Sequence, residues 1–280
     1  MGITATDVKT LRDKTGAGML DCKKALEQAA GDFAKAEKLL KEQGLAAASK
    51  RSTRATNEGR IFSLVTKQGA GLLELSCETD FVARNQDFIS LGNTLLKSIL
   101  DNKITESNEE LEHFVKEAIG RIKENLTIKR FSTIETSGND YICDYIHGEG
   151  KIGVLVKATS ENPKDFENEK IKEFLFDCTL HIAAYNPSFL TKKAIPQEYL
   201  NEQEEIFTKQ VESLGKPAKV LAGIVQGKLN KHLSEICFME QPFVKDDKRS
   251  VGKVLEDINK EYSAKVSIPV YQYFRVGESL

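Results

Sequence analysis

Apolar residues recur at helical spacing through the first forty-odd positions, and glycines interrupt the pattern. The pattern predicts three short helices, because glycine tolerates positive φ and ends helices. Their expected ranges are 7–15, 19–30 and 33–43, with Gly44 closing the third. A bundle this small buries little surface and is marginally stable alone, so it is more typical of a docking module than of a catalytic domain.

From Glu58 the apolar spacing changes from helical to alternating. Two strand-like runs flank the turn Gln68–Gly71, and two amphipathic helices follow them. The same order then occurs a second time: strands around a G-x-G turn at Gly148–Gly150, followed by a helix. This repetition predicts a tandem α+β core and suggests a diverged duplication. The expected strands are 60–67, 72–78, 127–136, 141–147, 151–158 and 266–275, and the expected helices are 79–100, 108–125, 163–185 and 251–262.

Residues 196–240 have a narrower apolar seam than the core helices. Apolar residues on both sides of the turn Gly215–Pro217 repeat at intervals of three, four and seven positions. This predicts a helical hairpin like a short antiparallel coiled coil, inserted in the core as an arm.

The predicted fold class is therefore α+β, with four parts along the chain. The three-helix module occupies residues 1–44, and a small, basic linker occupies residues 45–57. The core has an N-subdomain at residues 58–138 and a C-subdomain at residues 139–280, which carries the arm. The basic cluster in the linker is interpreted mainly as a solvated tether, with a partner contact at Arg51 as the less favoured alternative.

Charge and composition exclude several classes of protein. Lys+Arg number 40 and Asp+Glu 42 in 280 residues, so the formal net charge is −2. This near balance argues against binding nucleic acid directly. No apolar run reaches the roughly 20 residues that span a bilayer, and the first residues lack the pattern of a signal peptide. We therefore expect a cytoplasmic protein with no membrane partner.

Motifs for catalysis or metal binding are absent from the sequence. The five cysteines are far apart and never form C-x-x-C, so we expect reduced thiols and no metal site. Gly148–Gly153 matches G-x-G-x-x-G, but its last glycine lies in a predicted strand, whereas a dinucleotide site needs a helix there. We expect no cofactor and no covalent chemistry; a hydrolase with a dispersed site stays an alternative.

Two stretches together resemble one protein family. The first, Val8–Leu26, reads V-x-x-L-R-x-x-T-G-A-G-M-L-D-C-K-K-A-L, and the second, Cys77–Asn85, reads C-E-T-D-F-V-A-R-N. Both are similar to bacterial translation elongation factor Ts. H-G-x-G-K-I-G-V-L-V at 147–156 also fits, with Lys151 where the family commonly has arginine, as does Q-P-F-V at 241–244.

The resemblance implies a fold and a function. The family has a three-helix module similar to ubiquitin-associated (UBA) domains, a two-part α+β core and a coiled-coil arm. Its members exchange guanine nucleotides on elongation factor Tu: they bind the GDP form, displace its Mg²⁺ and promote GDP release so that GTP can rebind. The implied partner is elongation factor Tu, contacted through its G domain and a second domain; self-association through the C-subdomain is left open.

The resemblance also implies which residues contact the partner. The segment Thr79, Asp80, Phe81 and Val82 would press on the G domain, with the Phe81 ring as a wedge. The further expected contacts are Arg12, Met19, Leu20, Lys23, Arg51 and His147. Many members continue beyond the last strand into a helical module that touches the partner; the sequence ends at Leu280, so we expect that contact to be missing and the affinity to be lower.

Pattern alone favours a different role for Phe81. It precedes Phe88 by seven residues on the apolar stripe of the helix expected at 79–100, which is typical of a core residue. The resemblance reverses that interpretation and predicts an exposed Phe81 beside Asp80, which can also cap its own helix. The rival function is an adaptor that uses the three-helix module and the arm without promoting exchange.

Overall fold

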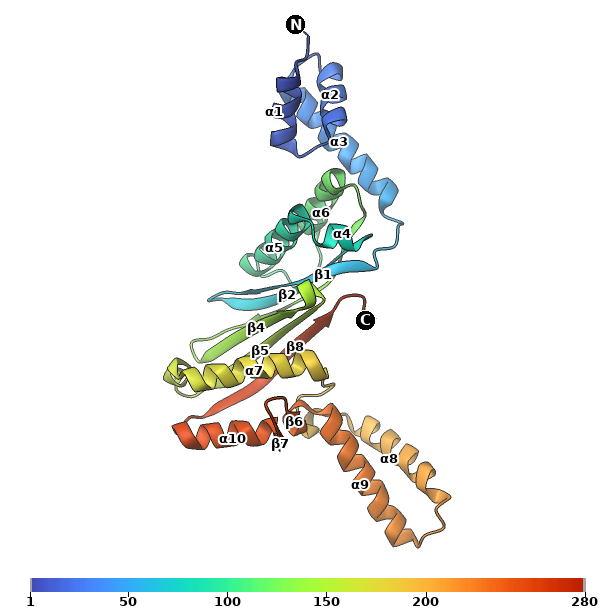
Figure 1. Cartoon of the computed structure of the whole chain (residues 1–280), viewed down its shortest axis with the longest axis vertical. Helices are drawn as coiled ribbons and strands as arrows, with labels where there is room; N and C mark the ends of the chain where they lie inside the picture. The colour runs from blue at the N-terminus through green and yellow to red at the C-terminus, as the bar shows by residue number, and fades with distance from the viewer. Residues whose placement is uncertain (1, 279–280) are drawn as a thin grey trace. The chain divides into compact units, whose positions relative to one another are not determined.

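The computed structural model describes residues 2–278 and is an α+β fold, as predicted (Figure 1). Among these residues it has ten α-helices and three small sheets, with strand orders β1-β2-β3, β4-β5-β8 and β6-β7. The chain divides into two compact units. The first comprises the chain up to Ile134, Ile146–Gly153 and the segment from Phe274 on; the second comprises Glu135–Tyr145 and Val154–Tyr273.

The first unit begins with three helices around a small apolar core. They are α1 (Ala5–Thr15), α2 (Met19–Gln28) and α3 (Phe33–Arg51). Thr4 and Asp7 form a capping box at the start of α1, and Asp32 caps α3, so polar side chains satisfy the backbone N–H groups that have no partner within the helix. Leu11, Cys22 and Leu26 are fully buried between the helices.

The expected end of the third helix at Gly44 is wrong. Helix α3 continues through Gly44 to Arg51, so residues 45–51 of the expected linker are helical. Gly44 lies against Gly120 of α6 (Glu109–Ile122), and a Cβ on Gly44 would meet the Gly120 Cα at 3.5 Å. The glycine permits a close helix–helix contact here instead of ending the helix.

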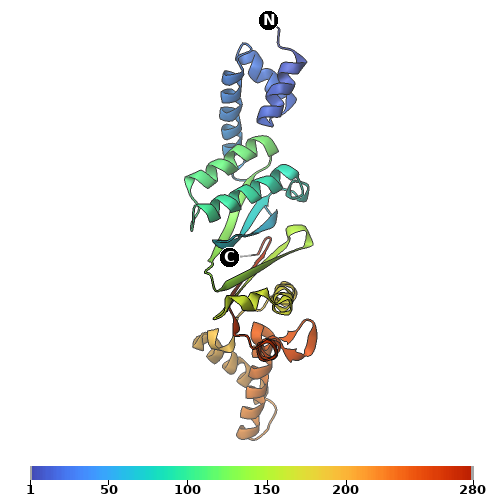
Figure 2. The same cartoon turned by 90° about the vertical axis from the view of Figure 1, so that its left-hand side faces the viewer.

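A three-stranded sheet and two long helices complete the first unit (Figure 2). β1 (Glu58–Val65) pairs antiparallel with β2 (Gly69–Cys77), and β3 (Leu126–Glu135) lies on the other side of β2. Every residue of β2 is buried. Helices α5 (Gln86–Asp101) and α6 supply the rest of the core, which contains Phe88, Leu95 and Ile99.

The single helix expected from Thr79 to about Leu100 is wrong. The structure divides it into a short helix, α4 (Asp80–Ala83), and α5, with Arg84 and Asn85 between them. The Asn85 side chain accepts the Asp87 N–H at 2.7 Å and caps α5. Asn85 thus begins a new helix, because its side-chain oxygen accepts a backbone N–H that has no acceptor within the helix.

An ion pair with a buried carboxylate holds the end of β8 and the segment after it within the first unit. Glu74 on β2 is 1% exposed, and its carboxylate accepts Arg130 Nε–H at 2.8 Å and the Gly277 N–H at 2.9 Å. Arg130 Nη2 also donates to the Arg275 carbonyl at 3.0 Å, and the guanidinium lies 4.3 Å from the centre of the Phe274 ring. The buried Glu74 carboxylate is tolerated here because it accepts hydrogen bonds from a guanidinium and from a backbone N–H.

The second unit is built on the sheet β4-β5-β8. Its strands are β4 (Asp140–His147), β5 (Ile152–Ser160) and β8 (Val266–Arg275). Helix α7 (Glu169–Tyr185) packs on this sheet, since the rings of Tyr145 and Phe176 meet edge to face at 6.1 Å. Helix α10 (Val251–Tyr262) and the short strands β6 (Pro242–Phe243) and β7 (Asp246–Ser250) follow the arm; β6 and β7 were not predicted.

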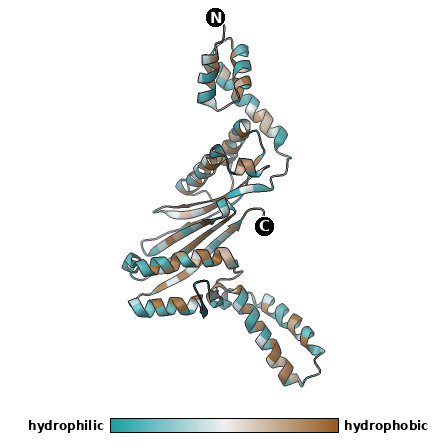
Figure 3. Cartoon of the chain, in the orientation of Figure 1, coloured by the Kyte–Doolittle hydropathy of each residue, from teal (hydrophilic) through white to brown (hydrophobic). Residues whose placement is uncertain are grey.

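The expected arm contains two helices that pack on each other. They are α8 (Gln197–Glu212) and α9 (Ala218–Ile236), and Figure 3 shows hydrophobic and hydrophilic residues mixed along both. Val211, Val225, Leu229 and Leu233 are buried, and Tyr199 Oη lies 2.8 Å from His232 Nε2. Among residues 2–278, no helix is both long and apolar enough to cross a membrane.

A buried histidine joins α7 to the segment that follows the arm. His181 is fully buried; its Nδ1 accepts the Val244 N–H at 3.1 Å, and its Nε2 lies 2.9 Å from Gln241 Oε1. Because Nδ1 is an acceptor, Nε2 must carry the proton in the neutral ring. Gln241 Nε2 donates in turn to the Glu235 carbonyl at 2.6 Å.

Stability should therefore fall in mild acid. Burial lowers the pKa of His181 below its ordinary value of 6.5. Between the lowered pKa and about pH 6.5, the unfolded chain binds a proton at His181 that the folded chain does not bind. The contribution of His181 to the unfolding free energy is therefore fully present above about pH 6.5 and is lost as the pH falls toward the lowered pKa. We expect the unfolding free energy of the protein to decrease by up to about 1.4 kcal/mol per pH unit there, measured by urea denaturation. His181→Gln, which cannot titrate, should lose this component; an identical slope in both proteins would contradict the assignment.

Candidate partner-binding site

A strand-to-helix corner carries the segment Thr79–Val82. Strand β2 ends at Cys77, and Thr79 caps α4 with its side chain, which accepts the Val82 N–H at 3.4 Å. The Cys77 thiol donates to the Thr79 carbonyl at 3.1 Å. Because both sides of the corner are hydrogen-bonded, the corner is a rigid base for the side chains of α4.

Glu124, which follows α6, fixes this corner from outside. Its carboxylate accepts the backbone N–H groups of Glu78 and Thr79 at 3.1 and 3.0 Å and the Thr79 hydroxyl at 2.6 Å. A carboxylate that accepts backbone N–H groups beside a helix start is stabilised by those donors. Sequence analysis missed Glu124, because no local pattern marks a side chain that acts 45 residues away from its partner.

Successive residues of α4 face different environments. Ala83 is buried, and Val82 packs partly against the core of the first unit. Phe81 is 81% exposed, more than any other large apolar side chain that the structure describes. The expectation of a core Phe81, drawn from its spacing to Phe88, is wrong, and the exposed ring beside Asp80 is what the family resemblance predicts.

Asp80 lies at the edge of a hollow of about 340 Å³ that the G-x-G turn completes. Arg84 links the two sides: its guanidinium is 3.8 Å from the Asp80 carboxylate and 3.3 Å from that of Glu149. The turn needs left-handed backbone at Gly148, Glu149 and Gly150, where φ is 58°, 55° and 95°. His147, at the exposed end of β4, directly precedes this turn.

The expected contacts on the three-helix module form a second group. Met19 and Leu20 open α2 and are 46% and 63% exposed, and with Lys23 they line a shallow apolar hollow against α1. Arg12 is exposed in the last turn of α1.

Arg51 differs from the other expected contacts. It is the last residue of α3, and its Nε and Nη1 atoms are buried without a hydrogen-bond partner among the described residues. These two atoms are not presented to a partner in this conformation. Its role in partner binding stays a prediction that no observation supports.

The cysteine thiols of the described residues are buried. All five cysteines are buried, and burial, followed by the charge of Glu124, raises the pKa of Cys77 to about 12. A thiol with so high a pKa is neutral and unreactive at neutral pH. Residues 2–278 also contain no group of three or more His, Cys, Asp or Glu side chains placed to hold a metal ion.

Comparison with known proteins defines the class. A family described as Elongation factor TS matches residues 78–278. Elongation factor Ts of Treponema denticola is 46% identical over 277 residues, which cover 99% of this chain and 99% of the relative. Those of Borrelia recurrentis and Borreliella burgdorferi are 44% and 45% identical over 280 and 276 residues, covering 99% and 98% of this chain and 100% and 99% of the relatives. These matches show that the chain is a translation elongation factor. It belongs to the elongation factor Ts family.

Proposed function

We propose that this protein is the guanine-nucleotide exchange factor for elongation factor Tu. It binds the GDP form of that partner and promotes GDP release, so that GTP can rebind. The observation that supports this most is the exposed Phe81 on a capped, hydrogen-bonded corner, in a chain of the elongation factor Ts family.

The physical role proposed for Phe81 is a wedge in an apolar pocket of the partner's G domain. Fully burying a phenylalanine side chain contributes about 1.5–3 kcal/mol. That free energy can stabilise a G domain whose Mg²⁺ site is distorted, with Thr79, Asp80 and Val82 supporting the ring. Loss of Mg²⁺ removes a large positive charge from beside the diphosphate, so GDP leaves faster.

The remaining contacts extend this interface. Arg12, Met19, Leu20 and Lys23 would bind the G domain from the three-helix module, and His147 would bind it beside α4. We also propose that the module has a UBA-like fold and that α8 and α9 form an antiparallel coiled coil, which leaves the core free to reach a second domain of the partner. None of these roles needs a cofactor or a covalent step.

Exchange of this kind is negative coupling between two ligands of one protein, and coupling is reciprocal. If this protein weakens GDP binding to elongation factor Tu by some factor, GDP must weaken the binding of this protein by the same factor. We therefore expect titration calorimetry to give a higher dissociation constant of this protein for the GDP-bound partner than for the nucleotide-free partner. The factor should equal the one by which this protein raises the dissociation constant of GDP. Equal dissociation constants would contradict exchange and support the adaptor.

A further inference from the structure

The Met19–Leu20 group and Phe81 lie on different parts of the first unit, and helix α6 contacts both parts. Helices α3 and α6 cross where Gly44 meets Gly120, and a Cβ on Gly120 would lie 3.0 Å from the Gly44 Cα. Any larger side chain at Gly120 would collide with backbone, which cannot turn away as a side chain can. The close approach of the two helices therefore depends on glycine at this position.

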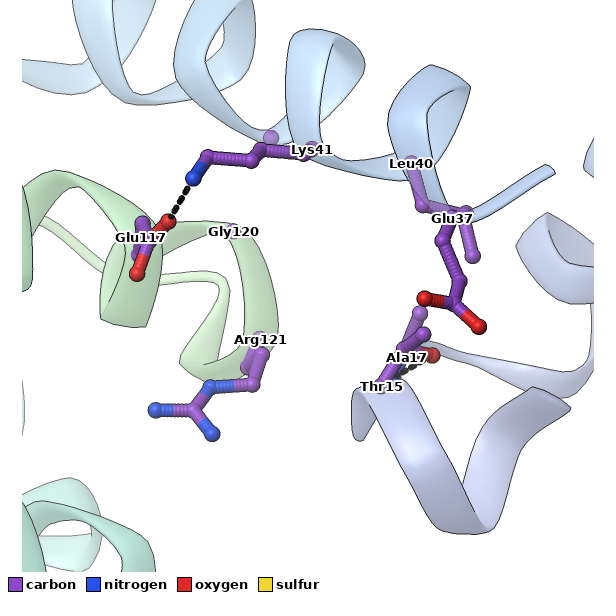
Figure 4. Close-up of a pocket in the computed structure, with 9 residues that line it drawn as sticks. Thr15, Ala17, Glu37, Leu40, Lys41, Glu117, Gly120 and Arg121 are labelled. Atoms are coloured by element: carbon purple, nitrogen blue, oxygen red, sulfur yellow. Dashed lines mark hydrogen bonds and ion pairs between the residues drawn. The ribbon is translucent and has the colours of Figure 1, made fainter. Parts of the chain in front are cut away.

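Two further contacts surround this crossing. Lys41 of α3 and Glu117 of α6 form an ion pair at 2.7 Å (Figure 4). The α1–α2 turn lies against α6, since a Cβ on Gly16 would be 3.0 Å from Arg121 Cδ. These contacts hold the three-helix module on the core at more than one point, so they fix its rotation as well as its distance.

The same helix end reaches both groups of contact residues. Lys123, the left-handed C-cap of α6, binds the Asp21 carboxylate at 3.0 Å, and Asp21 directly follows Leu20. Glu124 comes next in the chain and holds the Thr79 corner that carries Phe81. The path from Leu20 to Phe81 therefore passes through two consecutive residues of one turn.

We propose that Gly44 and Gly120 are positioning residues, and that their crossing and the turn Lys123–Glu124 hold the Met19–Leu20 group and Phe81 in one register for simultaneous binding to the partner. This inference rests on the proposed exchange function. Two contacts held at a matching separation bind as one unit, because the second contact forms without a further loss of translational freedom. The module then contributes affinity, while Phe81 carries the distortion of the G domain.

The glycine crossing matters more than the ion pairs around it. The side chains of Lys123 and Asp21 are 48% and 41% exposed, and ion pairs this exposed contribute little in water. Water and salt weaken such ion pairs, but they do not weaken a steric contact between two backbones. The informative substitution is therefore at Gly120.

The first test measures the separation of the module and the core directly. Spin labels on Lys24→Cys and Ser90→Cys, both at exposed positions, can be read by pulsed electron resonance, since the five native cysteines are buried. We expect one narrow distance distribution for the otherwise unchanged protein and a shifted or broadened one for Gly120→Leu. Gly223→Leu, on α9 where a Cβ would meet nothing within 4 Å, is the matched control and should change nothing. A broad distribution before substitution, or the same distribution in Gly120→Leu, would overturn the proposal.

The second test measures exchange on elongation factor Tu with labelled GDP. For Gly120→Leu we expect the half-saturating concentration of this protein to rise about tenfold, while the maximal release rate stays within about twofold. Gly223→Leu, whose Cβ would meet nothing within 4 Å, should behave like the unchanged protein. An unchanged half-saturating concentration, or a fall in the maximal rate alone, would contradict the positioning role.

A smaller substitution covers the case in which Gly120→Leu fails to fold. Gly120→Ala adds only a Cβ, 3.0 Å from the Gly44 Cα. We expect this variant to shift or broaden the distance distribution, and an unchanged distribution would overturn the proposal. If the unchanged protein did not accelerate GDP release, the proposed function would fail, whereas the distance measurement would still decide whether the crossing fixes the module.

Discussion

Phe81→Ala should slow GDP release from elongation factor Tu by roughly 10- to 100-fold at a fixed protein concentration. The estimate follows from losing about 1.5–3 kcal/mol of apolar burial in the complex, at tenfold for each 1.4 kcal/mol. The unfolding free energy should change by less than about 0.5 kcal/mol, because the ring is 81% exposed in the free protein. Stopped-flow fluorescence and urea denaturation measure the two quantities.

Phe88→Ala is the matched control for that substitution. Phe88 lies seven residues further on and is fully buried in the core of the first unit. Its removal should cost about 3–5 kcal/mol of stability, because it leaves a cavity. If Phe81→Ala destabilised the fold as much, or left GDP release unchanged, Phe81 would be a structural residue and the wedge would be wrong.

Arg130→Met should destabilise the protein by about 3–5 kcal/mol, the second large effect we expect. It leaves the Glu74 carboxylate buried without its charged partner, and removing one member of a buried ion pair costs that much. The segment around Gly277 should also become more sensitive to protease, since Arg130 no longer holds the Arg275 carbonyl. Urea denaturation and limited proteolysis measure these effects.

Two variants make the result interpretable. Arg249→Met removes the exposed ion pairs of Arg249 with Asp246 and Asp257 and should lower the unfolding free energy by less than about 1 kcal/mol. Glu74→Leu combined with Arg130→Met removes both members of the ion pair and should recover much of the lost stability. A loss below about 1 kcal/mol in Arg130→Met alone would show that Glu74 is not effectively buried.

Elements with strong periodicity and clear ends were predicted best from the sequence. The expected helix at 251–262 and strand at 266–275 coincide with α10 and β8. In α10, the Ser250 side chain caps the first turn, and a left-handed Ser263 ends the helix. Short-range physical chemistry decides such elements, so a single sequence contains most of the information.

Glycine and asparagine misled the prediction where tertiary contacts decide their role. Gly44 has the local properties of a helix end, but it permits the contact with Gly120, which is 76 positions away in the chain. Asn85 lies within a continuous apolar pattern and nevertheless caps a new helix. In both cases the competing interaction is invisible to a window of neighbouring residues.

The candidate site divides in the same way. The family resemblance predicted an exposed Phe81, against the periodicity, because a projecting apolar ring is a functional feature that packing rules do not anticipate. Glu124 and Lys123 could not be predicted, since their partners Thr79 and Asp21 are 45 and 102 positions away. Long-range hydrogen bonds of this kind need coordinates.

The most direct test of the account is the release of fluorescent GDP from purified elongation factor Tu in excess unlabelled nucleotide, with and without this protein. The account predicts a rate that rises with protein concentration to a maximum well above the intrinsic rate, and a smaller effect when Mg²⁺ is already removed by a chelator. The contradicting result is a GDP release rate that stays at the intrinsic value at saturating concentrations of the folded protein, although binding to the partner is demonstrated.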